Sequence, residues 1–239
     1  MILHTNVIGT GESIVFLHTG LQTGKNDFTV QQEHFKEQYK VFSPDLRGHG
    51  KSVGDVTEHY FADAAKDLYE TLNHHDVKMV NLVGCSLGAL VAVKFAQLFP
   101  ELVKSLTVSG ITIEKPDNWL ELHASDVAVQ SAILKNEEFI NHFNQLHDSD
   151  WRQFLELGRR EDWYPFEDMQ AFNHFSFPVL LLVGERQSAE TAAVELFPEN
   201  NENVHIAIIP FAGHLVHDEQ TEIYVRVLED FLLNCKKSK

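Results

Sequence analysis

Short runs of β-branched and aromatic residues alternate along the chain with longer segments whose apolar residues recur every three to four positions. The short runs are typical of strands, and several are apolar at successive positions, as in strands covered on both faces. The longer segments, clearest at residues 61–72, 87–99 and 223–232, are typical of helices. The alternation predicts a mostly parallel sheet with crossover helices on both faces. The predicted strands are residues 2–8, 13–17, 40–43, 77–83, 104–109, 177–183 and 204–209.

The first two strand runs are separated only by Gly9, Thr10 and Gly11. Glycine reaches the positive φ angles that a tight turn needs. This spacing predicts a hairpin between residues 2–8 and 13–17, with its second arm ending at His18.

The alternation stops in one long segment, residues 112–176, which has helical patterns but no convincing strand. It also contains all three tryptophans of the chain, Trp119, Trp151 and Trp163. An insertion of this length in a compact α/β domain is usually functional. We therefore expect a helical cap or lid at 112–176 and an α/β core formed by 1–111 and 177–239. Its aromatic residues either line an apolar pocket or hold the cap together.

The composition is that of one folded domain, with 239 residues, 44% of them hydrophobic and 23% charged. The net charge of −16 repels phosphate backbones and anionic lipid surfaces, so neither nucleic acid nor membrane is an expected partner. Two cysteines cannot form a disulfide framework, and the start of the chain lacks the pattern of a signal peptide. No apolar run approaches the roughly 18 residues of a membrane span. We expect a soluble, cytoplasmic protein; the sequence leaves its oligomeric state open.

The most informative motif is Gly84-Cys85-Ser86-Leu87-Gly88, a G-x-S-x-G sequence between an apolar strand and an apolar helix. A nucleophilic serine must be exposed on a sharp strand-to-helix turn, and small residues two before and two after allow that turn. The backbone N–H of Leu87 and the helix dipole can then stabilise an oxyanion. A chance glycine turn is the alternative interpretation, but the flanking strand and helix favour a nucleophile at Ser86.

A serine hydroxyl needs a base, and histidine has the pKa for that role. His214 follows the strand 204–209 and precedes the last helix, so it lies at a carboxyl strand end, where open α/β sheets hold their sites. His217 and Asp218 could join His214 as metal ligands, but no further ligand has suitable spacing. We therefore expect no metal.

Taken together, these motifs resemble those of the α/β-hydrolase superfamily, over nearly the whole chain and in the family's order. The resemblance implies the α/β-hydrolase fold, with a mostly parallel, doubly wound sheet and a helical cap between the sixth and seventh core strands. It also implies Ser86 as nucleophile, His214 as general base, an oxyanion hole from the N–H groups of Leu87 and Gly20, and no cofactor. The motifs are His18-Thr19-Gly20, residues 45–52, the serine motif at 84–88 and Gly213-His214.

The chain departs from this family where the acid of the catalytic triad is expected. The family pattern after the strand 177–183 is G-E-x-D, whereas this chain has Gln187 in place of the aspartate. An amide cannot stabilise an imidazolium by charge. Some members carry the acid after the sixth strand instead, which makes Glu114 the first candidate here, with Glu185 and Glu190 behind it.

These features predict a serine hydrolase that cleaves a small carboxylic ester or related acyl compound, apolar or aromatic in character, through an acyl-enzyme intermediate. A carbon–carbon bond hydrolase or lactonase could use the same serine and histidine. A ligand-binding or sensor protein without turnover is the alternative from another class, and Gln187 is the feature that favours it.

Overall fold

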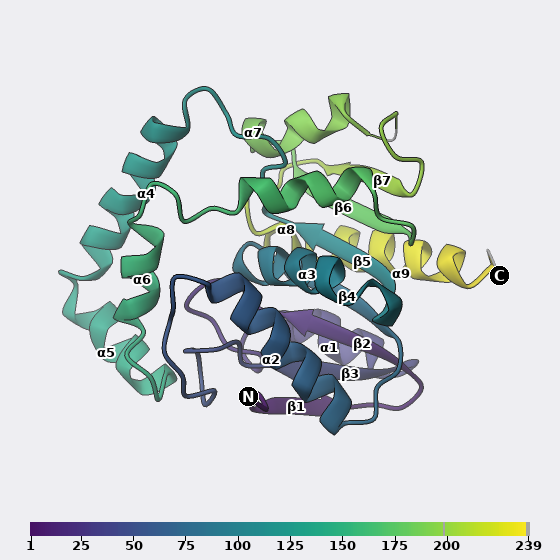
Figure 1. Ribbon diagram of the computed structural model, residues 1–239, viewed down its shortest axis with the longest axis horizontal. Helices are drawn as coiled ribbons and strands as arrows, with labels where there is room; N and C mark the ends of the chain where they lie inside the picture. The colour runs from purple at the N-terminus through teal and green to yellow at the C-terminus, as the bar shows by residue number, and fades with distance from the viewer. Residues whose placement is uncertain (198, 238–239) are drawn as a thin grey trace.

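The computed structural model describes residues 1–197 and 199–237, and its centre is a seven-stranded sheet with helices on both faces (Figure 1). The strand order is β1-β3-β2-β4-β5-β6-β7. β1 is antiparallel to β3, and the other neighbouring pairs are parallel. The predicted mostly parallel sheet is thus confirmed. The strands are β1 (Thr5–Ile8), β2 (Glu12–Leu17), β3 (Tyr39–Pro44), β4 (Val80–Cys85), β5 (Val103–Ser109), β6 (Val179–Gly184) and β7 (Val204–Ile209).

The predicted hairpin between the first two strands is wrong. β3 lies between β1 and β2, and β1 pairs with it so that Thr5 faces Pro44. The connection must therefore pass over the start of β3. A Cβ atom at Gly9, whose φ is 74°, would lie 2.3 Å from the carbonyl oxygen of Tyr39. The glycines serve this close passage over another strand, which the local sequence does not reveal.

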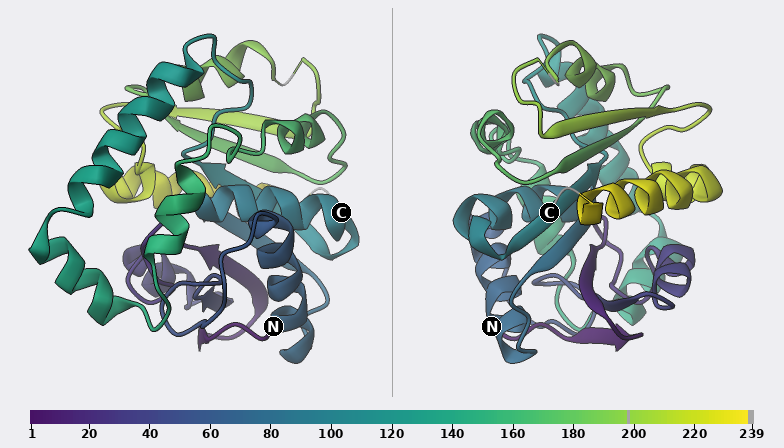
Figure 2. Two further views of the ribbon diagram at one scale, coloured as in Figure 1. Left: turned by 60° about the vertical axis from the view of Figure 1, so that its left-hand side comes forward. Right: turned by 90° about the vertical axis from the view of Figure 1, so that its right-hand side faces the viewer.

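Two pairs of helices cover the two faces of the sheet (Figures 1 and 2). Helices α2 (Tyr60–His74) and α3 (Leu87–Leu98) lie on one face, and α1 (Thr29–Phe35) and α9 (Thr221–Lys237) lie on the other. Both faces carry their own cluster of buried apolar side chains. The doubly wound arrangement predicted from the alternating pattern is present.

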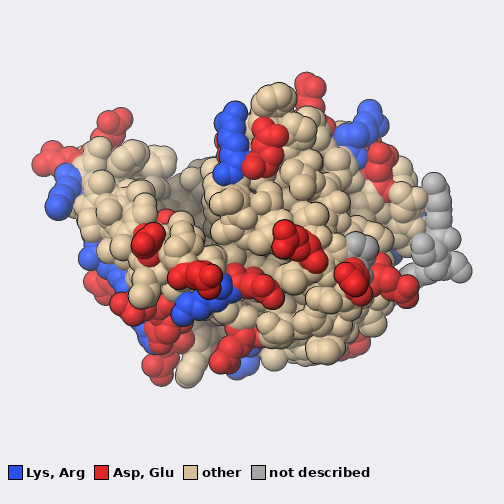
Figure 3. Space-filling model, turned by 90° about the horizontal axis from the view of Figure 1, so that it is seen from above, with Lys and Arg blue, Asp and Glu red and all other residues tan. Residues whose placement is uncertain are grey.

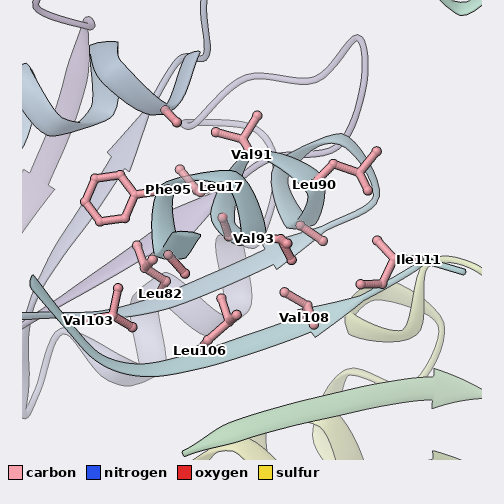
Figure 4. Close-up of a cluster of buried hydrophobic side chains, with 14 of the residues drawn as sticks. Leu17, Leu82, Leu90, Val91, Val93, Phe95, Val103, Leu106, Val108 and Ile111 are labelled. Carbon is pink, nitrogen blue, oxygen red and sulfur yellow. The ribbon is translucent and has the colours of Figure 1, made fainter. Parts of the chain in front are cut away.

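Helix α3 is the central element of the larger cluster. It is buried nearly all round, as its apolar sequence predicts. Figure 4 shows Val93 of α3 on the side of the helix that faces Leu106 and Val108 of β5, and all three belong to the larger cluster. This packing fixes the axis of α3, and with it the position of the residue that precedes the helix.

A helical segment connects β5 to β6. It contains α4 (Trp119–Ile133), α5 (Glu137–Leu146) and α6 (Arg152–Gly158), followed by a 3-10 helix, Phe166–Asn173. The sheet has seven strands, so the segment lies between its fifth and sixth strands along the chain and not between a sixth and a seventh. The predicted helical character of the segment is nevertheless present.

The parts of this segment differ in how they pack. Helices α4, α5 and α6 stand off from the sheet, beyond the carboxyl ends of its strands (Figures 1 and 2). The 3-10 helix instead packs against α3, and its side chains Met169 and Phe172 belong to the core cluster. The end of the segment is therefore a structural part of the core.

The remaining helices are short. They are α7 (Ser188–Thr191), α8 (Val216–Glu219) and the 3-10 helices Pro100–Leu102 and Ala192–Glu195. Within the described residues, no helix combines the length and the apolar character needed to cross a bilayer.

Candidate active site

The residues singled out by the motifs lie on loops that follow β2, β4 and β7, at the carboxyl edge of the sheet. In parallel α/β sheets this edge is where ligands bind. The helices α4, α5 and α6 face the same edge, and the surface between them and the core is hollowed (Figure 3). The site is thus bounded by the sheet edge on one side and by the inserted helices on the other.

Ser86 occupies the sharp turn between β4 and α3. Its backbone has φ 53° and ψ −117°, a conformation that residues other than glycine rarely adopt. The Ser86 N–H is held by the carbonyl of Ser109 at 2.9 Å, so β5 fixes the turn from the side. Strain of this kind persists only where the surroundings enforce it, and it is common at functional sites.

The two glycines of the motif are needed for steric reasons. A Cβ atom at Gly84 would lie 2.6 Å from the backbone of Gly88. A Cβ atom at Gly88 would lie 2.1 Å from the carbonyl oxygen of Leu17, at the end of β2. The strand-to-helix turn can therefore close only with glycine at both positions, as the sequence predicts.

His214 lies beside this turn. The Cys85 thiol contacts the carbonyl oxygen of His214 at 3.8 Å. A Cβ atom at Gly110 would touch both the His214 ring, at 3.0 Å, and the Cys85 sulfur, at 3.2 Å. The structure therefore brings His214 next to the residue that precedes Ser86.

The carboxylate partner of His214 is Glu190. Its Oε1 atom lies 2.8 Å from Nδ1 of His214, and its side chain is buried on α7. Because a carboxylate only accepts, Nδ1 carries the hydrogen and Nε2 is the ring atom that remains free to act. Gln187 is the residue just before this short helix, so Glu190 lies three residues after the position where the family carries its aspartate.

The first choice of Glu114 as the orienting acid is corrected by this contact. Glu114 is exposed near the start of the inserted segment, whereas Glu190 makes the hydrogen bond to the imidazole. The third candidate, Glu185, accepts the N–H of Phe211 at 2.7 Å and so supports the backbone of the loop that carries His214. The short helix α7 separates Glu190 from the expected position at Gln187.

Carboxylates determine the electrostatics of His214. Partial burial lowers the pKa of its imidazole, but the hydrogen bond and charge of Glu190 outweigh that effect and raise the pKa. Asp126 on α4 and Glu219 on α8 add to the rise. Asp126 shows that the inserted helices act on the site, and nothing in the sequence motifs points to it.

The turn after β2 supplies the second expected oxyanion donor, the N–H of Gly20. The His18 ring accepts the N–H of Leu46 at Nε2, so its Nδ1 atom carries a hydrogen and donates to the Thr19 carbonyl at 2.7 Å. In a trans peptide the following N–H points opposite to the carbonyl. The Gly20 N–H is thereby directed away from His18.

Inserted helices complete the walls around this turn. A Cβ atom at Gly20 would lie 2.9 Å from the ring of Phe154 on α6, so a larger residue at this position would displace the aromatic side chain. His147 accepts the N–H of Gly50 at Nδ1, and its Nε2 atom contacts the carbonyl of Leu21 at 3.2 Å. The insertion thus contacts both the oxyanion turn and the motif at residues 45–52.

His217, considered above with His214 and Asp218 as a metal ligand, has a different role in the fold. It pairs with Asp27, at 2.7 Å between Nε2 and Oδ1. Among the described residues, no three His, Cys, Asp or Glu side chains are grouped so that they could hold a metal ion.

Comparisons with known proteins support the same family. The model of the α/β hydrolase fold family matches residues 12–155. A protein of Haemophilus influenzae named "Putative esterase/lipase" is 26% identical over 241 residues, which cover 92% of this chain and 82% of that protein.

Solved structures agree over almost the entire chain. NosK from Streptomyces actuosus has a TM-score of 0.82 and 26% identity, covering 94% of this chain and 99% of its own. A thermophilic esterase from Thermogutta terrifontis has a TM-score of 0.74 and 20% identity, covering 98% of this chain and 93% of its own, which shows a shared fold. With the strand-turn-helix motif at Ser86 and the match over residues 12–155, the chain belongs to the α/β hydrolase fold family.

Proposed function

We propose that this α/β hydrolase is a serine hydrolase that cleaves a small carboxylic ester or related acyl compound through an acyl-enzyme intermediate. The observation that carries the proposal is the arrangement around Ser86. The serine stands at the N-terminus of α3, and next to Cys85, the residue before it, lies a histidine whose Nδ1 atom is held by a buried glutamate. A nucleophile, a base and a group that orients the base are the parts that acyl transfer needs.

In the first half-reaction, the Ser86 oxygen attacks the carbonyl carbon of the ester while Nε2 of His214 takes the hydroxyl proton. The electron pair of the C=O π bond moves to oxygen, and the N–H groups of Leu87 and Gly20 stabilise the negative charge. When the carbonyl re-forms, the bond to the alcohol oxygen breaks. That oxygen takes the proton from His214, and the acyl group stays on Ser86.

Water completes the cycle by the same steps. His214 takes a proton from water as its oxygen attacks the acyl carbon, and the proton then passes to the departing Ser86 oxygen. Glu190 stabilises the imidazolium that forms twice per cycle. No group outside this chain is needed for the proton transfers.

The segment 112–176 acts as a cap over this site in our proposal. Phe154 on α6 lies directly over Gly20, and the charge of Asp126 on α4 acts on His214. Phe154 offers the acyl chain an apolar contact, which favours apolar or aromatic acyl compounds. The alternative of a binding protein without turnover rested on Gln187, and Glu190 removes that support.

The decisive experiment combines labelling with hydrolysis. We expect a fluorophosphonate probe to label Ser86, with the serine oxygen displacing fluoride from phosphorus, and we expect hydrolysis of p-nitrophenyl butyrate. Ser86→Ala should abolish both while leaving the circular dichroism spectrum unchanged, because alanine fits where serine does. Most of the hydrolysis surviving in pure Ser86→Ala protein would rule out the serine mechanism.

A further inference from the structure

A second pair of histidine and carboxylate side chains lies next to the oxyanion turn, which is the turn His18-Thr19-Gly20 after β2. Nε2 of His217 is 2.7 Å from Oδ1 of Asp27, and both side chains are more than nine-tenths buried, at 4% and 9% exposure. The ring of His217 stacks on Phe28, with centroids 4.0 Å apart. A buried charged group is costly unless it is paired and hydrogen-bonded, so this pair is a fixed part of the fold.

Asp27 holds the oxyanion turn by its backbone. Its Oδ2 atom accepts the N–H of Thr19 at 2.8 Å, and its Oδ1 atom accepts the N–H of Phe28 at 2.9 Å in addition to the His217 contact. The Thr19 N–H is therefore drawn toward Asp27, while the Thr19 carbonyl is drawn toward His18. The Thr19 N–H belongs to the peptide between His18 and Thr19, and the Thr19 carbonyl belongs to the peptide between Thr19 and Gly20. The two contacts therefore fix both peptides that meet at Thr19, and with them the direction of the Gly20 N–H.

His217 in turn lies on the short helix that directly follows the loop of His214. This helix is α8, and His217 comes three residues after His214. Glu219, at the end of the same short helix, accepts the N–H groups of Gly213 at 2.8 Å and Leu215 at 3.1 Å, the two residues that flank His214. The backbone of α8 is also held by Gln31, which donates to the His217 carbonyl at 2.6 Å.

We propose that Asp27 and His217 are positioning residues that set the oxyanion donor of Gly20 relative to His214. The inference rests on the proposed hydrolase function, since it assigns the Gly20 N–H to the transition state. Asp27 and His217 touch neither Ser86 nor the substrate. They connect the oxyanion turn, through the side chain of Asp27, to the helix that holds the loop of His214.

The expected effect follows from where the oxyanion forms. The negative charge on the carbonyl oxygen appears only in the transition state, so a displaced donor lowers kcat more than it raises KM. Loss of an entire oxyanion donor lowers kcat by about 10²- to 10³-fold in serine hydrolases of known mechanism. A donor that is displaced but not removed should cost less, about 10- to 100-fold.

The test compares His217→Phe with His217→Gln. Phenylalanine keeps the stacking on Phe28 but has no donor for Asp27, whereas the glutamine amide can donate to it. We expect His217→Phe to lower kcat for p-nitrophenyl butyrate by about 10- to 100-fold with KM within about threefold, and His217→Gln to recover most of the loss. Asp27→Asn has only one acceptor oxygen, so it cannot accept the N–H groups of both Thr19 and Phe28. Its kcat should fall as in His217→Phe, and it replaces that variant in the test if His217→Phe does not fold.

Ser105→Ala is the matched control for lost stability. Ser105 is fully buried and donates to Asn81 at 2.8 Å, a contact between β4 and β5 away from the oxyanion turn. This variant should lower the melting temperature and leave kcat unchanged. A trifluoromethyl alkyl ketone, which forms an oxyanion adduct with a serine hydrolase, gives a second measurement: its inhibition constant should rise in His217→Phe by about the factor lost from kcat/KM, and not in Ser105→Ala.

The outcomes separate the two proposals. If wild-type protein is labelled and active but His217→Phe and Asp27→Asn keep wild-type kcat and ketone affinity, the positioning role is wrong and the hydrolase function stands. If KM alone rises, or if Ser105→Ala loses as much kcat, the pair contributes only to packing and the inference is overturned. If wild-type protein is neither labelled nor active, the proposed function fails, and this inference fails with it.

Discussion

At the scale of single residues, the contact between Glu190 and His214 decides how the imidazole behaves. The imidazole is 43% exposed at the site, while its partner is buried at 6% exposure. Burial raises the pKa of Glu190, and the hydrogen bond and charge of His214 oppose that rise. Because little water screens this contact, the carboxylate charge acts strongly on the imidazole. The contact therefore serves both orientation and charge.

Replacing this glutamate should lower the rate of the chemical step. We expect Glu190→Gln to reduce kcat by about 10²- to 10⁴-fold, by analogy with loss of the triad acid in serine proteases, and to change KM much less. Glu114→Gln is the matched control, since the same substitution falls on an exposed side chain. Steady-state kinetics on p-nitrophenyl butyrate give kcat and KM for both variants. An unchanged kcat in Glu190→Gln would show that Glu190 has no role in the mechanism.

The pH dependence of kcat/KM gives an independent measurement of the same contact. A general base acts when it is deprotonated, so activity rises with pH as His214 loses its proton. Glu190 raises the pKa of His214 and moves this ascending limb to higher pH. In Glu190→Gln the limb should shift to lower pH. An unshifted limb, with intact protein, would show that another group titrates.

Ser86 and His214 could be predicted because their sequence signals are local. Ser86 stands between two glycines at a strand-to-helix turn, and His214 follows the end of a strand. The sequence could not favour Glu190 over Glu114, and the reason is physical. Its distance from His214 depends on a four-residue helix, Ser188–Thr191, too short to produce a periodic pattern. Asp126 was missed because only the docking of α4 brings it near the site.

At the scale of elements, the sheet could be predicted strand by strand but not in its pairing at the edge. Every predicted strand exists, and the strands from β2 to β6 are largely buried, as their apolar runs indicate. β1 pairs with β3, which lies about 30 residues further along the chain. The residues of the turn between β1 and β2 do not indicate this long-range pairing. The glycines of that turn fit a hairpin and a crossing equally well.

Polar contacts add to the apolar packing that holds the inserted segment to the core. Within the segment, the hydroxyl of Tyr164 accepts the N–H of Thr112 at 2.7 Å and donates to its carbonyl at 3.0 Å, which fixes the start of the segment just after β5. His147 makes the contacts with Gly50 and Leu21 described above, and the N–H of Asp148 donates to the carbonyl of Gly50 at 2.8 Å. These contacts place α4, α5 and α6 over the carboxyl edge of the sheet.

Loss of the His147 contacts should therefore destabilise the protein. Burial lowers the pKa of His147, which favours the neutral ring that can accept the Gly50 N–H. We expect His147→Phe to lower the free energy of unfolding by about 1–3 kcal/mol, because two buried backbone groups lose their partner. Urea denaturation at neutral pH measures this. His142→Phe, the same change at an exposed position of α5, is the control; equal losses in both variants would show that His147 does not anchor the segment.

At the scale of the whole molecule, the site exists because separate connections meet at one edge of the sheet. Ser86 follows β4, His214 follows β7, Glu190 follows β6 and Gly20 follows β2. The carboxyl ends of parallel strands meet at the same edge, so the alternating pattern already predicts which loops come together. The distances within the site depend on buried polar pairs, which no periodicity encodes. Asp27 and His217 form such a pair although 190 positions separate them along the chain.

The Asp27–His217 pair should also appear in the acid stability of the whole protein. Burial raises the pKa of Asp27, but the hydrogen bond and charge of His217, together with the Thr19 N–H and the charge of His18, outweigh it and lower the pKa from 3.8 to about 2. A lowered folded-state pKa means that the carboxylate stabilises the fold above its unfolded pKa, and that this contribution is lost as pH falls through about 2. The difference in pKa corresponds to about 2 kcal/mol.

We therefore expect the free energy of unfolding of the wild-type protein to fall more steeply than that of Asp27→Asn between about pH 4 and about pH 2, by about 2 kcal/mol over the interval. The comparison is needed because many carboxylates of this acidic chain, with its net charge of −16 at pH 7, protonate over the same range. Asp150→Asn, the same change at an exposed side chain, serves as the control. Urea denaturation at several pH values gives the two slopes. Parallel curves for wild type and Asp27→Asn would mean that Asp27 is not held ionised by His217, and would also weaken the positioning role proposed for this pair.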